Sequence, residues 1–130
     1  MILGIGTDLA RIQRFEDLLA RRGEAISRRL LTPSEQAAMA QAAKPAAYLA
    51  KRFAAKEALL KALGTGLRDG LSWQQLEVSN DALGKPELQL TGRAAALAEQ
   101  KGVQRIHLSI SDEQEQALAF VVLEGRAASN

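Results

Sequence analysis

Apolar and polar residues follow two different periods along this chain, and each period predicts one kind of element. Residues 46–63 are rich in Ala, Leu, Lys and Glu, which are strong helix formers, and Gly64 and Gly66 supply a turn after them. Residues 105–111 instead alternate strictly between polar and apolar side chains, which is the period of a strand. A second strand over 117–124 is expected to pair with it in antiparallel fashion.

The remaining segments predict shorter elements on both sides of the long helix. The apolar residues 1–3 lead through two glycines to Asp8, which we place at the exit of a buried strand and before a helix. Thr32-Pro33-Ser34-Glu35 is typical of a helix start, with Thr as the cap, and this short helix should end before Pro45. The further expected elements are strands over 73–79 and 86–90, a helix over 91–101 and a frayed tail at 125–130.

This order of elements predicts an α+β fold, in which an antiparallel sheet packs against the long helix. At 130 residues the chain is expected to form one domain, residues 1–130, that can bury its own core. Cysteine is absent, which excludes disulfides and thiolate nucleophiles and fits a reducing cytoplasm. No apolar run approaches the ~20 residues that span a bilayer, so we expect a cytoplasmic protein with no membrane partner.

Charge is nearly balanced over the whole chain, with 17 basic and 15 acidic side chains, but it is unevenly placed. Several arginines crowd the first predicted helix, within an arc of about 100° that has Leu18 in its middle. They are Arg11, Arg14, Arg21 and Arg22.

Such a face fits a solvated helix surface, a nucleic-acid patch or a dock for an acidic helix. Nucleic acid is the weakest choice, because the chain has five aromatic residues, no recognisable nucleic-acid motif and little net charge. An acidic partner helix would pair its carboxylates with the arginines while Leu18 enters an apolar gap.

The segment from Arg52 to Gly66 carries the clearest chemistry. Glu57 and Lys61 are four residues apart on the predicted helix and therefore share a face. This arrangement suits Mg²⁺ and phosphate, because Mg²⁺ prefers one or two carboxylates plus phosphate oxygens. It is also typical of a surface ion pair that contributes only about 0.2–0.5 kcal/mol. The wider pattern Phe-Ala-x-Lys-Glu-Ala-x-x-Lys-Ala-x-Gly resembles the defining motif of the small holo-acyl-carrier-protein synthases, which are phosphopantetheinyl transferases.

Further segments match the same family. Ile5-Gly6-Thr7-Asp8-Leu9 matches at the N-terminus, where the resemblance makes Asp8 a Mg²⁺ ligand and the residue type alone predicts a helix N-cap. His107-Leu108-Ser109-Ile110-Ser111-Asp112 matches the element that lines the coenzyme A cleft, and it also fits a solvated strand face. Gly84-Lys85-Pro86 matches an element beside the coenzyme and also fits a hairpin turn. Asp112 departs from the pattern, since close relatives commonly have a second His there.

The resemblance covers nearly the whole chain and implies a 4′-phosphopantetheinyl transferase-like fold, assembled as a homotrimer with active sites at the subunit interfaces. The implied reaction transfers 4′-phosphopantetheine from coenzyme A to a serine of apo-acyl carrier protein for fatty acid biosynthesis, and it releases adenosine 3′,5′-bisphosphate. One alternative is a noncatalytic module that binds an acidic helical protein. Another is an enzyme of this fold that acts on carrier domains of polyketide or peptide synthetases, which the short chain disfavours.

The resemblance also implies roles for individual residues. Asp8 and Glu57 would hold one Mg²⁺ on the pyrophosphate of coenzyme A, and Lys61 would steady the leaving phosphate. The general base stays open among Glu57, Asp8 and a metal-bound hydroxide. The candidates for coenzyme binding are Arg52, Lys56, Lys85, Pro86, His107 and Ser109. The candidates for carrier-protein docking are Arg14, Leu18, Arg21 and Arg28.

Overall fold

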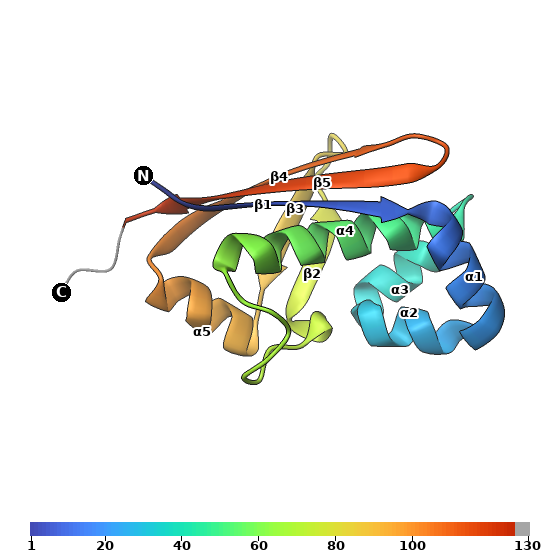
Figure 1. The fold of residues 1–130 in the computed structure, drawn as a ribbon, viewed down its shortest axis with the longest axis horizontal. Helices are drawn as coiled ribbons and strands as arrows, with labels where there is room; N and C mark the ends of the chain where they lie inside the picture. Colours follow the sequence, from blue (N-terminus) through green and yellow to red (C-terminus); the bar gives the residue numbers. More distant parts are fainter. Residues whose placement is uncertain (127–130) are drawn as a thin grey trace.

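A long helix, α4 (Pro45–Leu63), lies along one face of an antiparallel sheet in the computed structural model, which describes residues 1–126 (Figure 1). The sheet has three strands in the spatial order β1 (Ile2–Arg11), β5 (Gln116–Gly125) and β4 (Val103–Asp112). The α+β architecture that the sequence predicts is therefore confirmed, including the long helix and the closing pair of strands.

The other elements lie around the two ends of α4. Figure 1 places α1 (Ile12–Arg22), α2 (Glu24–Leu30) and α3 (Pro33–Ala40) at one end and α5 (Gly92–Gln100) near the other. A separate antiparallel hairpin, formed by β2 and β3, completes the fold. In chain order these elements are α1, α2, α3, the 3-10 turn η1 (Trp73–Gln75), β2 (Leu76–Asn80), β3 (Pro86–Leu90) and α5.

Three elements differ from the sequence prediction. The strand predicted over 73–79 begins only at Leu76, because residues 73–75 form the 3-10 turn η1, which the Ser72 side chain caps. β1 continues to Arg11, which is itself the N-cap of α1, so Asp8 lies inside the strand opposite Ala119. The prediction of Asp8 as a helix N-cap is wrong, because the free N–H groups of α1 begin several residues later. The helix α2 was not predicted; it follows α1 after Gly23, whose positive φ of 57° favours glycine.

The chain ends are tied to the sheet up to residue 126. The backbone N–H of Gly125 donates to Met1, and that of Arg126 donates to Gly102. The predicted fraying does not extend to Gly125 and Arg126, and residues 127–130 lie outside the described part of the chain. Within the described part, no helix has the length and apolar character to cross a membrane. The cytoplasmic location stays a prediction.

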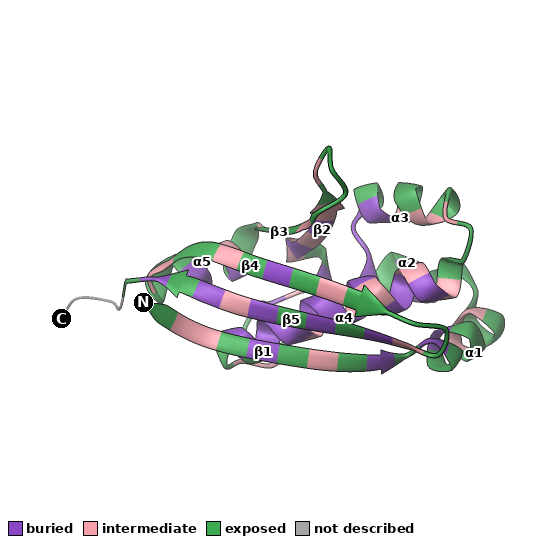
Figure 2. Ribbon diagram, turned by 90° about the horizontal axis from the view of Figure 1, so that it is seen from above, coloured by how far each residue is buried: buried purple, intermediate pink, exposed green. Residues whose placement is uncertain are grey.

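Alternation along the strands gives the sheet one buried and one exposed face (Figure 2). The buried face rests on α4, and β5 contributes Ala117, Ala119, Val121 and Leu123 to it. The opposite face also carries large apolar side chains, and these are 40–61% exposed: Ile5, Leu9, Leu118 and Phe120. A contiguous exposed apolar surface of this kind is typical of a protein–protein interface.

Two glycines set the distance between β1 and α4. A Cβ at Gly4 would overlap the backbone carbonyl of Ala62, and a Cβ at Gly6 would overlap that of Ala58. The strand therefore lies directly on the helix backbone, closer than any other residue would allow. This approach fixes where the inward side chain of Asp8, two residues after Gly6, meets α4.

A buried ion pair joins α4 to α3. The Lys56 ammonium lies 2.6 Å from Glu35 Oε1, and both side chains are almost completely buried. Lys56 also donates to the carbonyl oxygens of Leu30 and Trp73, while Glu35 accepts from the backbone N–H groups of Thr32 and Val78. Burial lowers the pKa of Lys56, and the Glu35 carboxylate opposes that shift. The pair connects α4, α3, η1 and β2 at one point.

We expect Lys56→Met to lower the free energy of unfolding by about 3–5 kcal/mol, because it leaves the Glu35 carboxylate buried without a counter-charge. Urea titration followed by circular dichroism measures this loss. Adding Glu35→Gln to that variant should recover part of it, since the amide oxygen still accepts from the backbone. Lys101→Met, at the exposed end of α5, is the control with the same change in charge. Equal losses in the two single variants would contradict the prediction.

Candidate functional site

Asp8, Glu57 and Lys61 come together where β1 crosses the second half of α4. The Lys61 ammonium lies 3.0 Å from Asp8 Oδ1 and donates to the Thr7 carbonyl at the same distance. Lys61 therefore pairs with Asp8 on the neighbouring strand, and not with Glu57 as the predicted surface pair would have it. The side chain of Lys61 remains 54% exposed and that of Asp8 15% exposed, so the cluster opens to solvent on the lysine side.

The electrostatics of this cluster centre on Glu57. Partial burial raises the pKa of Glu57, and the Asp8 carboxylate raises it further by repulsion. The cations of Lys61 and Arg14 oppose both effects. Two carboxylates that repel each other in a half-buried position favour the approach of a further positive charge.

The donor set matches the ligand preferences of Mg²⁺ when a phosphate supplies the remaining oxygens. Mg²⁺ is commonly held by one or two carboxylates together with substrate phosphates and water. Across residues 1–126, Asp, Glu, His and Cys side chains form no group of three or more that could hold a metal ion. Asp8 and Glu57 would thus provide only part of a coordination shell, and a phosphorylated substrate would complete it.

A second site lies on the other side of the molecule. The residues predicted to contact coenzyme at Lys85, Pro86, His107 and Ser109 all line one cleft of about 490 Å³. The hairpin strand β3 forms one wall, and the exposed face of β4 and β5 forms the other, with Phe120 and Val122 as apolar floor. The structure therefore brings these four residues together, although they come from segments more than 20 positions apart.

Within this cleft, His107 already has a partner on β5. Its Nε2 lies 2.9 Å from Glu124 Oε1, and about half of each side chain is exposed. The hydrogen bond from His107 lowers the pKa of the exposed Glu124 carboxylate. This contact orients the imidazole beside the cleft and was not predicted, because it depends on the pairing of β4 with β5.

The structure corrects two of the predicted coenzyme contacts. Lys56 is completely buried in its ion pair with Glu35, so its ammonium has no surface to offer a phosphate. Arg52 is 7% exposed; it donates to Asn80 Oδ1 at 2.9 Å and its guanidinium stacks on Tyr48. Both cations therefore stabilise the fold, since Lys56 joins α4 to α3 and Arg52 joins α4 to β2. Sequence reasoning missed their partners because Glu35 and Asn80 lie 21 and 28 positions away.

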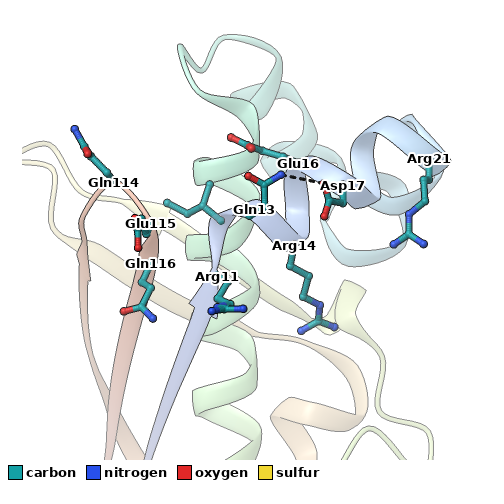
Figure 3. A pocket seen from close by; sticks show the side chains of 10 residues that line it. Arg11, Gln13, Arg14, Glu16, Asp17, Arg21, Gln114, Glu115 and Gln116 are labelled. Carbon is teal, nitrogen blue, oxygen red and sulfur yellow. Dashed lines mark hydrogen bonds between the residues drawn. The ribbon is translucent and has the colours of Figure 1, made fainter.

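The predicted docking residues lie on two helices. Arg14 and Arg21 extend to the same side of α1 and line a polar pocket of about 580 Å³ between α1 and the turn that joins β4 to β5 (Figure 3). Leu18 lies beside them in a second groove, whereas Arg28 belongs to α2 and pairs weakly with Glu24 at 3.6 Å. The docking set is therefore split between α1 and α2.

The second groove, of about 460 Å³, runs between α1 and α2 over an aromatic floor. Phe15, Phe53 and Trp73 follow one another with ring centroids 5.2 and 5.5 Å apart. The Arg14 guanidinium covers both phenylalanine rings at 5.3–5.5 Å. Arg22 belongs to the predicted basic face and lies on the rim of this groove. Sequence reasoning did not place Trp73 or Arg29 here, because only tertiary packing brings η1 and α2 beside α1.

The acidic cluster and the coenzyme-type cleft face opposite sides of the same sheet. Asp8 belongs to the row of β1 residues that includes Gly6 and faces α4, whereas His107 and Ser109 point outward from β4. β5 lies between the two strands. One copy of this chain therefore presents two separate half-sites. The acidic half-site consists of Asp8, Glu57 and Lys61, and the coenzyme half-site is the cleft lined by Lys85, Pro86, His107 and Ser109.

Comparison with known proteins gives consistent matches over almost the whole chain. The family model described as the 4′-phosphopantetheinyl transferase superfamily matches residues 4–121. A holo-[acyl-carrier-protein] synthase of Yersinia pseudotuberculosis is 51% identical over 123 residues, which cover 95% of this chain and 98% of that protein. The crystal structure of holo-[acyl-carrier-protein] synthase from Neisseria meningitidis superimposes with a TM-score of 0.90 at 48% identity, covering 95% and 99% of the two chains. That of the Bacillus anthracis enzyme in complex with CoA (3′,5′-ADP) has a TM-score of 0.80 at 37% identity and covers 97% and 99%.

Proposed function

The chain belongs to the 4′-phosphopantetheinyl transferase superfamily, and from this premise we propose that Asp8 and Glu57 make it a Mg²⁺-dependent holo-[acyl-carrier-protein] synthase. It transfers the 4′-phosphopantetheine arm of coenzyme A to a serine of apo-acyl carrier protein and releases adenosine 3′,5′-bisphosphate. The observation that carries the metal dependence is the partly buried pair of carboxylates where β1 crosses α4; burial raises the pKa of Glu57, and repulsion by Asp8 raises it further.

The chain's own residues supply positioning and charge. Bound Mg²⁺ would neutralise the pyrophosphate oxygens of coenzyme A, and Asp8 and Glu57 would hold it. The serine oxygen attacks the β-phosphorus and loses its proton to a general base, for which Glu57 and Asp8 are the candidates in this chain. The bond to the leaving bisphosphate breaks with its electron pair on the leaving oxygen. Lys61 carries a solvent-accessible ammonium beside Asp8, where it can offset that developing negative charge.

Coenzyme A is expected to occupy the cleft of Lys85, Pro86, His107 and Ser109. The supporting comparison is the Bacillus anthracis relative, whose structure contains CoA (3′,5′-ADP). Lys85 offers a point charge for a phosphate, and the exposed hydroxyl of Ser109 can donate to another oxygen. Phe120 and Val122 provide apolar surface for the rest of the molecule.

The acyl carrier protein is expected to dock on α1 and α2. Arg14, Arg21 and Arg28 would pair with carboxylates of the carrier, while Leu18 contacts an apolar side chain. The groove leads toward the acidic cluster, because its floor residue Phe53 lies one helical turn from Glu57 on the same face of α4. A carrier bound there would place its serine close to Glu57.

We also propose that the enzyme is a homotrimer whose active sites lie between subunits. The two half-sites of one chain face opposite sides of the sheet, so a second copy must bring its cleft to the acidic cluster of the first. The exposed apolar row of Ile5, Leu9, Leu118 and Phe120 gives such an assembly a surface to bury. Repetition of one such contact around a threefold axis closes a ring.

The first test measures the mass of a purified apo-acyl carrier protein after incubation with this protein, coenzyme A and Mg²⁺. We expect a gain of one phosphopantetheine arm, which EDTA abolishes. Glu57→Gln should lower turnover at least about 100-fold, a typical effect of losing a preorganised charged group at the reacting centre. Glu99→Gln, on the exposed face of α5, should leave it unchanged. Normal turnover with EDTA would exclude the metal from the mechanism.

The docking proposal predicts a selective effect on the carrier substrate. Arg14→Glu combined with Arg21→Glu should raise the KM for acyl carrier protein and leave the KM for coenzyme A nearly unchanged, because only the carrier contacts α1. Steady-state kinetics with each substrate varied in turn measure both constants. Arg14 also lowers the pKa of Glu57, whereas Arg21 does not act on it. Arg21→Glu alone therefore tests docking without changing the electrostatics of Glu57. The charge-matched control is Arg93→Glu with Lys101→Glu on α5; a similar rise in KM there would contradict specific docking.

Shared active sites predict complementation between inactive variants. Asp8→Asn damages the acidic half-site, and His107→Ala damages the coenzyme half-site. In mixed trimers of equal composition, about a quarter of the interfaces would combine two intact halves, so activity should return to about that fraction. Asp8→Asn mixed with Glu57→Gln is the control, because both changes damage the same half-site. Recovery in neither mixture would place each active site within one chain.

A further inference from the structure

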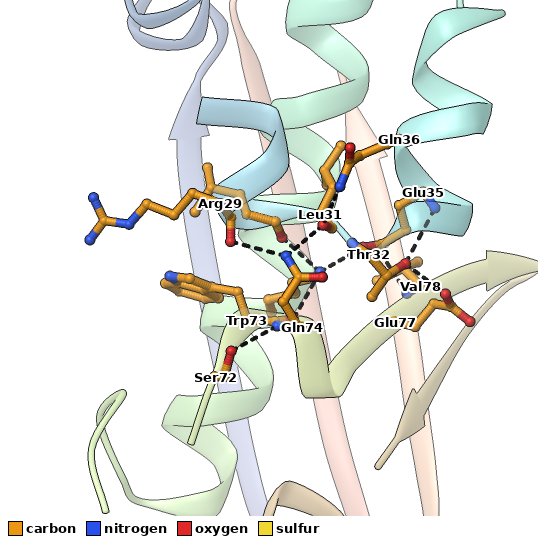
Figure 4. A network of polar contacts seen from close by, with 12 residues as sticks. Arg29, Leu31, Thr32, Glu35, Gln36, Ser72, Trp73, Gln74, Glu77 and Val78 are labelled. Atoms are coloured by element: carbon orange, nitrogen blue, oxygen red, sulfur yellow. Dashed lines mark hydrogen bonds and ion pairs between the residues drawn. The ribbon is translucent and has the colours of Figure 1, made fainter. Parts of the chain in front are cut away.

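The C-terminal end of α2 is held by side chains of η1, α3 and α4. Figure 4 shows two of them, Gln74 and Gln36. α2 has only seven residues, and its N-cap Gly23 provides no side-chain hydrogen bond. Helices of this length are unstable by themselves, and their last carbonyl groups lack partners within the helix. The position of Arg28 and Arg29 in its last turn therefore depends on contacts from outside α2.

Gln74 supplies the largest share of these contacts. Its Nε2 donates to the carbonyl oxygens of Arg28 at 2.8 Å and Leu31 at 2.7 Å, with Arg29 O at 3.4 Å. Gln36 of α3 donates to the same Leu31 carbonyl at 3.0 Å, and Lys56 of α4 donates to Leu30 at 2.8 Å. Side chains thus replace the missing backbone donors along the whole end of the helix.

Gln74 is itself fixed to the helix that carries the acidic cluster. Its backbone N–H donates to Ser72 Oγ at 3.2 Å, which caps η1. The preceding residue, Trp73, accepts a hydrogen bond from Lys56 and forms part of the aromatic floor of the groove. Lys56 directly precedes Glu57 in α4. A short chain of contacts therefore runs from the end of α2 through η1 to the site.

We propose that Gln74 is a positioning residue for the carrier protein, which sets the arginines of α2 at a fixed distance from Glu57. It acts through α2 and has no contact with substrate. This inference rests on the proposed docking of an acidic carrier on α1 and α2. The side chain of Gln74 reaches the helix end from an exposed position, so it can be changed without opening the core.

The neighbouring residue offers a matched control. Gln75 also uses its carboxamide on the backbone, donating to Gly70 O at 3.0 Å and accepting from Ala94 N at 3.1 Å, but these partners belong to the loop before η1 and to α5. Methionine has nearly the shape of glutamine, carries no charge and has no donor. Gln74→Met and Gln75→Met therefore each remove one side-chain carboxamide, but the hydrogen bonds that are lost belong to different elements.

Steady-state kinetics and amide hydrogen exchange test the proposal. Gln74→Met should raise the KM for acyl carrier protein about threefold to tenfold, the range expected for loss of one or two hydrogen bonds. It should leave kcat and the KM for coenzyme A unchanged, and it should speed exchange in residues 28–31. Gln75→Met should change neither carrier KM nor exchange in α2.

Three results would overturn this role. Unchanged exchange in α2 would show that Gln74 does not hold the helix. Faster exchange with an unchanged KM for the carrier would show that the position of α2 does not matter for docking. A wild-type protein that fails to modify any carrier would refute the proposed function and the carrier role with it, while the exchange measurement would still decide whether Gln74 orders α2.

Discussion

The close approach of β1 to α4 is the constraint on which the rest of this structure depends. Because Gly4 and Gly6 have no side chains, the strand rests directly on the carbonyl groups of Ala62 and Ala58. The next inward residue on the strand is Asp8, which meets Lys61 and Glu57 on the helix. Backbone contact thus replaces side-chain packing at the one place where three charged groups must share a small volume.

The sheet that rests on α4 also divides the chemistry into two parts. Its inner side holds the acidic cluster, and its outer side holds the cleft of Lys85, Pro86, His107 and Ser109. A thin sheet cannot bring its own two faces together, and this separation is what supports the proposal that a second copy completes each active site. The exposed apolar residues on the outer side fit this proposal, because burying them against a second copy would stabilise the assembly.

The sequence predicted most of what depends on local pattern and much less of what depends on tertiary contact. The helical spacing of Glu57 and Lys61 and the outward row of His107 and Ser109 follow from periods of 3.6 and 2 residues, and both are found in the structure. Asp8 was placed at a strand end because nothing in the local sequence marks how far β5 extends beside β1. Lys56 was taken for a coenzyme contact because its partner Glu35 lies in another helix, and a sequence pattern does not show which lysine is buried.

Neighbouring residues in α4 serve different parts of the molecule. Lys56 points into the protein interior and Glu57 toward the acidic cluster, with about 100° of helical rotation between them. Deleting one residue between Phe53 and Lys56 would bring Glu57 into the place of Lys56, so that a carboxylate would face Glu35. Inserting one residue there would bring Lys56 into the place of Glu57, and either change would shift Ala58 and Ala62 away from the glycines of β1. The length of this segment is therefore as constrained as its composition.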